Sequence, residues 1–317
     1  MPQKTHDSTG RFALRKAAAL AKYCVLTVDV THSGRYAVEA LTRTMSTLAP
    51  KMPQPSKPSV FPFVIGRLKK SLLSLQDYAF LFADTMRKAV SPPIYFPDLV
   101  EQMDLIGVGS LPIIVLTGFF IGGVMVQNTA AQFQRFGSAS LTGVVVSLGL
   151  VRELGPVIAG LLVTGRNGSA IASELGSMVV TEQVDAMRAL GTDPVRKLVV
   201  PRVLATLIVL PLLTAIADFV GLIGGMIVSR LTLAQTAAQF WNQAIQALEF
   251  GDLVQGMIKP IIFALIISTI GCFFGLRTRG GTQGVGRSTI AAVVVASITI
   301  IMVDFFLGKL LLYYFVS

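Results

Sequence analysis

Residues 105–134 read LIGVGSLPIIVLTGFFIGGVMVQNTAAQFQ and contain no charged side chain. About 20 consecutive apolar residues are enough for a helix to cross the hydrocarbon core of a bilayer. This run therefore predicts a membrane-spanning helix over about 106–127. The whole chain is similarly apolar, since 53% of its 317 residues are hydrophobic and only 14% are charged, whereas soluble domains carry about 25% charged residues. The sequence is that of a polytopic, all-α membrane protein.

Four more apolar runs of membrane-spanning length follow the first one. We expect these spans at about 141–165, 203–228, 253–276 and 288–315, which gives five spans within 106–315. The segments that join them differ sharply in charge. Residues 61–105, 166–202 and 276–287 together hold thirteen Lys and Arg, whereas the segments on the other side hold only Arg135, Arg230 and Lys309. Because basic residues favour the cytoplasmic side, we expect the N-terminus inside and the C-terminus outside.

The part before the spans divides into two segments. Residues 1–60 hold nine Lys and Arg against three Asp and Glu, and end in the Pro-rich KMPQPSKPS. We interpret them as a weakly ordered basic extension that touches anionic lipid; an acid-poor organelle transit peptide is the alternative. Residues 61–90 carry an apolar stripe at alternating steps of four and three, interrupted by too many charges for a span. This pattern predicts an amphipathic helix lying in the membrane interface.

The stretch TEQVDAMRALGTDPVRK (181–197) is unusually charged for its apolar surroundings. We expect Thr181 to cap a short helix that ends at Gly191, and Asp193 to cap the next helix. One face of the short helix is apolar and consists of Val180, Val184 and Met187. The opposite face is charged and consists of Glu182, Asp185 and Arg188. Such a helix either transmits force from a soluble partner or is an ordinary solvated connection.

Charged residues occur inside the predicted spans. Arg152 and Glu153 lie in LGLVRELGPVIAGLL (148–162), and Asp218 and Asp304 are further intramembrane acids. Because charges are costly at this depth, they should face a cavity, a partner or each other; purely structural ion pairs are the alternative. Pro156 predicts a distorted helix whose backbone is satisfied inside the bundle.

Glycines four residues apart occur in three spans, which indicates close helix packing or dimerisation. These pairs are Gly118 and Gly122, Gly221 and Gly225, and Gly271 and Gly275.

Three observations argue against catalysis by this chain. GTQGVGRS (281–288) resembles a nucleotide-binding P-loop with Arg287 in place of lysine, but no strand precedes it, so we expect a flexible loop without nucleotide. Cys24 and Cys272 are isolated, and the only histidines, His6 and His32, lie in the N-terminal extension. We therefore expect no metal site, no cofactor bound by this chain, no enzymatic activity and no nucleic-acid partner.

Two longer stretches resemble the signature region of the MlaE family. They are RELGPVIAGLLVTGRNGSAIASELGSM (152–178) and TEQVDAMRALGTDPVRKLVVPR (181–202), and residues 102–127 are also similar. Members of this family are permease subunits of ABC transporters that work with MCE proteins. The likeness extends from about Phe61 to the C-terminus, so residues 61–317 are interpreted as an MlaE-like permease domain.

The resemblance implies a homodimer with two cytoplasmic ATPase subunits, which use ATP and Mg, a small STAS-domain protein and a ring of MCE proteins. The implied cargo is phospholipid, moved between inner membrane and outer envelope in support of lipid asymmetry. The implied location is the inner membrane of a Gram-negative bacterium, or alternatively the chloroplast inner envelope. An ion-coupled secondary transporter using intramembrane acids is the rival function, although such transporters usually contain internal repeats, and none is evident here.

The resemblance also implies roles for particular residues. Residues 181–193 match the helix that docks into the ATPase, and the matching positions are Glu182, Gln183, Asp185, Arg188, Gly191 and Asp193. Arg152, Glu153 and Pro156 match the RELGP run and are expected to line or support the lipid pathway, with Asp218 as a further intramembrane polar residue.

Overall fold

The computed structural model describes residues 60–93, 95–135, 141–233 and 235–316, and these contain helices and no strand. Helix α3 (Val60–Val90) comes first, as expected for the amphipathic segment. The contacts of the chain divide it after Arg67, and the contacts described below all lie within residues 68–317. The interpretation of residues 1–60 as a basic extension falls almost entirely outside the described residues and stays a prediction.

Five helical stretches are long and apolar enough to cross a membrane, which confirms the predicted number of spans. Four of them consist of α4 (Phe96–Arg135), η4 (Val195–Val199) with α9 (Val200–Thr232), α11 (Phe250–Leu276) and α12 (Gly281–Val316). The second span consists of α5 (Thr142–Gly149), η2 (Leu150–Leu154), α6 (Gly155–Val163), η3 (Thr164–Gly168) and α7 (Ser169–Val180).

Every span is longer than the sequence predicted, because a helix does not stop where its apolar stretch stops. Helix α4 begins at Phe96, ten residues before the predicted start, and carries Asp98 in its first turn. The second span continues from the predicted end at 165 to Val180. Hydropathy finds only the part that a bilayer covers, whereas backbone hydrogen bonding continues into water.

The second span is distorted next to Pro156, as predicted. The turn Leu150–Leu154 is a π-helix, in which the Gly155 N–H donates to the Leu150 carbonyl instead of an oxygen four residues back. Proline has no N–H to continue the α-helical ladder, and a π turn takes up the irregularity. A second π turn, Thr164–Gly168, contains Arg166.

Helices α4 and α9 approach each other closely through their backbones. A Cβ added to Gly122 would lie 1.8 Å from the carbonyl oxygen of Gly221, and one added to Gly118 would lie 2.8 Å from that of Ala217. The predicted glycine pairs of these two spans therefore face one another within a single chain. Glycine lets two helix backbones touch, so that van der Waals contacts form along their length.

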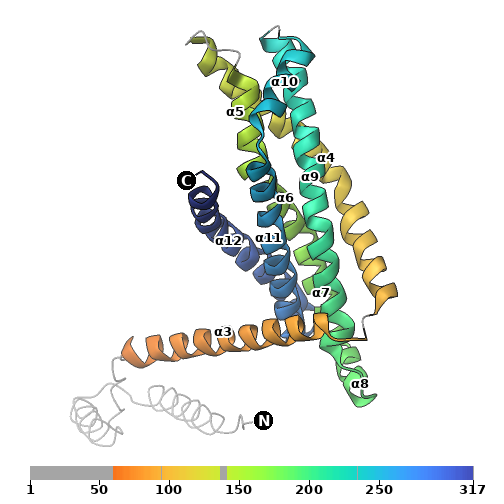
Figure 1. The fold of residues 1–317 in the computed structure, drawn as a ribbon. Coiled ribbons are helices and arrows are strands. Elements are labelled where there is room, and N and C mark those ends of the chain that lie inside the picture. Colours follow the sequence, from red (N-terminus) through yellow and green to blue (C-terminus); the bar gives the residue numbers. More distant parts are fainter. Residues whose placement is uncertain (1–59, 94, 136–140, 234, 317) are drawn as a thin grey trace, which may run out of the picture. The chain divides into compact units, whose positions relative to one another are not determined.

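Two short elements close the ends of the bundle. Helix α8 (Gln183–Ala189) lies at one end, and α10 (Ala237–Ala247) lies at the opposite end (Figure 1); we call these the α8 end and the α10 end. The sequence reasoning missed α10, although its start is a capping box between Thr236 and Gln239. Phe240 of α10 is fully buried against Val126 and Val146, which anchors the helix to α4 and α5.

The expectation of a flexible loop at 281–288 was wrong, because α12 begins at Gly281 and GTQGVGRS forms its first turns. Glycine lowers intrinsic helix propensity, which favoured a loop. Packing decides otherwise: a Cβ at Gly284 would lie 2.1 Å from the carbonyl oxygen of Arg279, and Val285 contacts the position of Gly176 on α7. The glycine at 284 is needed for the tight connection after α11.

Gly122→Ala should destabilise the chain, because the new methyl group must push α4 away from α9. Overpacking of this kind costs about 1–3 kcal/mol. The matched control is Gly286→Ala on α12, where an added Cβ meets nothing within 4 Å and alanine improves helix propensity. Thermal unfolding in detergent measures both. Equal melting temperatures for the two variants would contradict the close contact.

Candidate functional site

A buried ammonium group joins three of the spans. The Nζ of Lys259 on α11 donates to Glu153 Oε2 of η2 at 2.5 Å and lies 3.1 Å from Asp304 Oδ1 of α12. The Lys259 side chain is 0% exposed, whereas that of Glu153 is 47% exposed. A desolvated lysine of this kind is stable only with counter-ions. The three residues form what we call the Lys259 cluster.

Arg152 forms a second ion pair on the same π turn. Its Nε and Nη2 lie 2.6 Å and 2.5 Å from Asp252 Oδ1, in the first turn of α11. The other carboxylate oxygen of Asp252 accepts the N–H of Glu249 at 3.0 Å, so it also caps the helix. Since Asp252 and Lys259 are seven residues apart on α11, the π turn is fixed to this helix at two points about 10 Å apart.

The sequence left open whether Arg152 and Glu153 face a cavity, a partner or each other. In the structure each of them pairs with a residue of another helix, and they do not pair with each other. The sequence reasoning missed both partners, Asp252 and Lys259. A signal was available, because Lys259 is the only charged residue of α11 after Asp252 and stands directly before Pro260. A lone lysine inside a span calls for an intramembrane acid as its partner.

Asp218 lies apart from these pairs. It sits on α9 and its Oδ1 is buried, with no hydrogen-bond partner among the described residues. A Cβ added to Gly155 would lie 1.7 Å from that oxygen, so the carboxyl group packs against the backbone of the second span beside the buried Pro156. Asp218 therefore contacts the second span at the residue that follows the π turn.

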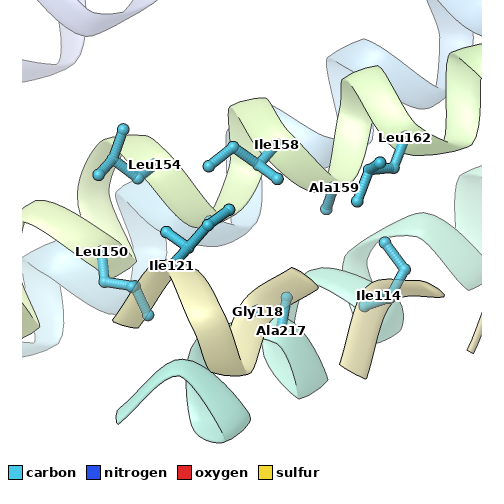
Figure 2. Close-up of a pocket in the computed structure, with 10 residues that line it drawn as sticks. Ile114, Gly118, Ile121, Leu150, Leu154, Ile158, Ala159, Leu162 and Ala217 are labelled. Atoms are coloured by element: carbon cyan, nitrogen blue, oxygen red, sulfur yellow. The ribbon is translucent and has the colours of Figure 1, made fainter. Parts of the chain in front are cut away.

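Two hollows lie between α4 and the second span. The smaller one, shown in Figure 2, is a mainly apolar seam of about 10 Å³, which holds at most one water-sized molecule. Its lining residues are Ile114, Gly118, Ile121, Leu150, Leu154, Gly155, Ile158, Ala159, Leu162 and Ala217. The two helices are therefore in close contact at this level.

The larger hollow is an open groove of about 530 Å³ along α4, which we call the α4 groove. It is lined mainly by apolar side chains, namely Leu116, Thr117, Phe120, Ile121, Val124, Met125, Asn128 and Leu154. Leu154 follows Glu153 in the chain, so the apolar groove reaches the neighbourhood of the Lys259 cluster. This volume is in the range of small-molecule and lipid-chain sites.

The predicted coupling segment forms a helix of seven residues, Gln183–Ala189. Thr181 does not cap it, which corrects the expectation: its hydroxyl donates to the carbonyl of Ser177 at 2.9 Å, so it completes α7. Glu182 then adopts a left-handed φ of 60° and reverses the chain between the two helices. A hydroxyl on the preceding helix has a nearer acceptor in that helix than in the next one.

The end of α8 follows the expected pattern. Gly191 has φ 77°, and the N–H groups of Gly191 and Thr192 return to the carbonyls of Arg188 and Met187 at 3.0 Å and 2.9 Å, as in a Schellman-type helix end. Asp193 Oδ1 accepts the N–H of Val195 at 3.0 Å and starts η4. The backbone on both sides of α8 is therefore fixed.

The two faces of α8 also match the amphipathic pattern. Val184 is 3% exposed and packs with Met187 in a cluster that includes Leu175, Leu198 and Cys272. The polar residues Glu182, Gln183, Asp185 and Arg188 are exposed. Asp185 and Arg188 form a surface pair at 2.9 Å with both side chains mostly exposed, which contributes little stability. The polar face is thus available to another molecule.

Ion pairs join the coupling segment to α3. Lys88 Nζ lies 2.5 Å from Asp193 Oδ2 and 2.6 Å from Asp84 Oδ2. Burial acts to lower the pKa of Lys88, but the two carboxylates outweigh it and raise that pKa above its ordinary value. Burial likewise acts to raise the pKa of Asp193, but Lys88 and the Val195 N–H outweigh it and lower that pKa below 3.8. Nearby, Lys197 pairs with Asp98 and lies 4.3 Å from the centre of the Tyr95 ring.

The pair between Asp193 and Lys88 should stabilise the fold over a defined pH window. Because the pKa of Asp193 is lowered by folding, its contribution to stability is lost as the pH falls through the pKa of Asp193 in the folded state. Because the pKa of Lys88 is raised, its contribution is lost as the pH rises through the pKa of Lys88 in the folded state. We expect Asp193→Asn to cost about 0.5–1 kcal/mol between about pH 4 and pH 10, because the pair is partly exposed. Thermal unfolding across pH measures this difference. A difference that persisted at pH 2 would show that the ion pair is not its cause.

Replacing only the two acids of the Lys259 cluster should destabilise the fold more than replacing all three residues of the cluster. Glu153→Gln with Asp304→Asn leaves a buried cation unpaired, and breaking a buried pair costs about 3–5 kcal/mol. Adding Lys259→Met should restore much of that loss. Lys309→Met, an exposed lysine on the same helix as Asp304, is the control. If the triple variant melted no higher than the double variant, Lys259 would not depend on these acids.

The chain is similar to known proteins over most of its length. The family model described as Permease MlaE matches residues 99–310. A probable ABC transporter permease protein of Rickettsia typhi is 41% identical over 222 residues, which are 70% of this chain and 86% of that protein. A probable ABC transporter permease protein of Synechocystis is 42% identical over 67% of this chain and 81% of its own length.

A relative from a plant is also similar. The chloroplastic protein TRIGALACTOSYLDIACYLGLYCEROL 1 of Arabidopsis thaliana is 35% identical over 255 residues, which are 80% of this chain and 73% of that protein. Residues 99–310, which the family model matches, contain the π turns, the Lys259 cluster and α8. The resemblance of the signature stretches to the MlaE family is confirmed. The chain belongs to the MlaE family and is an ABC transporter permease.

Proposed function

We propose that this permease moves phospholipid between an inner membrane and the outer envelope, and that it works as a homodimer with two separate ATPase subunits. A STAS-domain protein and an MCE ring complete the proposed assembly. ATP and Mg act at the ATPase and not on this chain. The N-terminus lies in the cytoplasm and the C-terminus on the far side of a Gram-negative inner membrane. The chloroplastic relative supports the chloroplast inner envelope as the alternative location.

The α4 groove is the observation that carries the proposed cargo. Its lining is apolar, and Leu116 and Phe120 are each 60% exposed, so the groove is open from the side of α4. Glu153, with its half-exposed carboxylate, precedes Leu154 of the groove lining in the chain. An apolar groove with a charged group beside it suits a molecule with hydrocarbon chains and a polar head. The plant relative has a diacylglycerol lipid in its name, which agrees with this class of cargo.

The packing of α8 suggests how an ATPase moves the groove. Val184 and Met187 pack with Leu175 of α7 and Leu198 of η4, in the same apolar cluster as Cys272 of α11. A push on α8 therefore acts directly on the second, third and fourth spans. Because close-packed interiors deform little, the movement should be taken up at the π turns. The turn Leu150–Leu154 carries Arg152, Glu153 and Leu154, so its rearrangement changes the groove.

The rival function is an ion-coupled transporter. It would use Glu153, Asp218 and Asp304 as ion sites, yet Glu153 and Asp304 already pair with Lys259, and all the similar proteins described above as permeases belong to ABC systems. Reconstitution separates the two functions. The proposed function requires lipid movement that depends on ATP and on an ATPase partner. Movement driven by an ion gradient alone, without a partner, would favour the rival.

Reversing two charges on α8 should release the ATPase without unfolding the permease. Glu182 and Asp185 are exposed, so Glu182→Lys with Asp185→Lys should leave the melting temperature unchanged. Docking surfaces with the wrong charge bind several kcal/mol more weakly, so we expect at least about tenfold less ATPase in the purified complex. Glu101→Lys, an exposed acid on the first turns of α4, is the control. Full recovery of an active ATPase with the α8 variant would exclude this docking site.

A further inference from the structure

Arg166 is an exposed guanidinium on the second span with no carboxylate partner among the described residues. The other basic residues deep in the bundle are all paired: Arg152 with Asp252, Arg202 with Glu174 and Lys259 with Glu153 and Asp304. The sequence reasoning assigned Arg166 no role beyond its place in the signature stretch. An unneutralised charge on a membrane-length helix calls for an external partner.

The guanidinium of Arg166 lies against three residues of α4, which we call its seat: Leu105, Gly109 and Ser110. Its Nη1 donates to Ser110 Oγ at 3.0 Å and to the Leu105 carbonyl at 3.4 Å. Ser110 is 1% exposed and also accepts Asn167 Nδ2 at 3.3 Å. The flat group covers Gly109, where an added Cβ would lie 2.3 Å from Nη2 and 2.4 Å from Nη1. Glycine at 109 is thus what allows the guanidinium to lie against α4.

Two nitrogens of the guanidinium have hydrogen-bonding capacity left. Both hydrogen bonds to α4 come from Nη1, and Nε and Nη2 make none within the described part of the chain. These two nitrogens form the parallel donor pair that fits two oxygens of a phosphate or a carboxylate. The contacts to α4 fix the position of the guanidinium, and Arg166 as a whole is exposed.

The depth of the guanidinium matches the head-group level of a leaflet. Asp104 is the last charged residue on α4 before the apolar stretch, and the Leu105 and Ser110 groups that Arg166 contacts follow it within about 9 Å along the helix. Arginine side chains commonly reach from a span to the interface. A head group near this end of the apolar stretch would therefore be within reach of Arg166.

Apolar side chains surround the same place. Leu105 is 50% exposed and Val108 is 63% exposed on α4, and Gly165, beside Arg166, is exposed with nothing within 4 Å of an added Cβ. A ligand here would have a charged oxygen group at Arg166 and hydrocarbon against the flanking leucine and valine. Among molecules of a membrane, a glycerophospholipid has both parts.

We propose that Arg166, seated on Gly109 and Ser110, binds the phosphate group of a phospholipid from the leaflet at the α8 end. This site lies about 15–20 Å along the helix from the middle of the α4 groove, so it is a separate place of contact. The binding does not depend on transport: the site would hold a phospholipid even if this permease carried another cargo.

Native mass spectrometry of the purified, full-length chain tests the site. Defined amounts of phosphatidylglycerol, or of diacylglycerol with the same chains, are added after delipidation. We expect the unmodified chain to retain phosphatidylglycerol in preference to diacylglycerol. Arg166→Gln should bind phosphatidylglycerol about tenfold or more weakly, since hydrogen bonds to charged groups are strong. Arg166→Lys should lie between them, because lysine lacks the paired donors.

Two further variants separate binding from folding. Gly109→Ala keeps the charge but removes the seat, so it should also weaken binding, at an unchanged melting temperature. Arg287→Gln removes an exposed basic residue of α12 and should bind as the unmodified chain does.

Equal retention of phosphatidylglycerol by Arg166→Gln and the unmodified chain would overturn the proposal. So would equal retention of diacylglycerol and phosphatidylglycerol by the unmodified chain. A change of oligomeric state in Arg166→Gln with unchanged lipid binding would instead assign Arg166 to a carboxylate of a second copy. Loss of lipid transport with intact phospholipid binding would refute only the proposed function.

Discussion

The ammonium group of Lys259 is the constraint on which the middle of this permease depends. A lysine with no exposed surface must have counter-ions, and they come from two other helices, through Glu153 and Asp304. The cluster thereby fixes the π turn of the second span against α11 and α12. Because Leu154 of that turn lines the α4 groove, an electrostatic requirement of one buried charge determines the position of an apolar wall.

Hydropathy and charge predicted the five spans, the amphipathic α3 and the two faces of α8, because these features repeat along a single helix. Two errors arose from local contacts that the hydropathy pattern does not show. Thr181 has an acceptor on its own helix, and Gly284 packs against Arg279, so neither the cap nor the loop at 281–288 formed as expected. Distant segments decide the ion pairs. The partners of Arg152 and Glu153 are about 100 residues away in sequence, and no local pattern specifies which helices meet.

The route from α8 to the groove follows from where this fold is rigid and where it is not. Glycine contacts hold α4 and α9 backbone to backbone, so this pair moves as a unit. The second span lies between that pair and α11 and contains two π turns, whereas the third span has one, η4, at its start beside α8. Irregular turns have weaker hydrogen-bond ladders than the α-helices around them. Force applied at α8 is therefore expected to change the shape of the second span before it separates α4 from α9.

The two arginines of the second span differ in how their charge is neutralised. Arg152 reaches Asp252 at the start of α11, near the α10 end, whereas Arg166 reaches the Leu105 carbonyl towards the α8 end. Their backbones are 14 residues, or about 21 Å, apart, and the side chains point away from one another. Arg152 is neutralised within the protein by Asp252, whereas Arg166 has no carboxylate partner among the described residues. The proposed phosphate of a phospholipid would neutralise Arg166 from outside the protein.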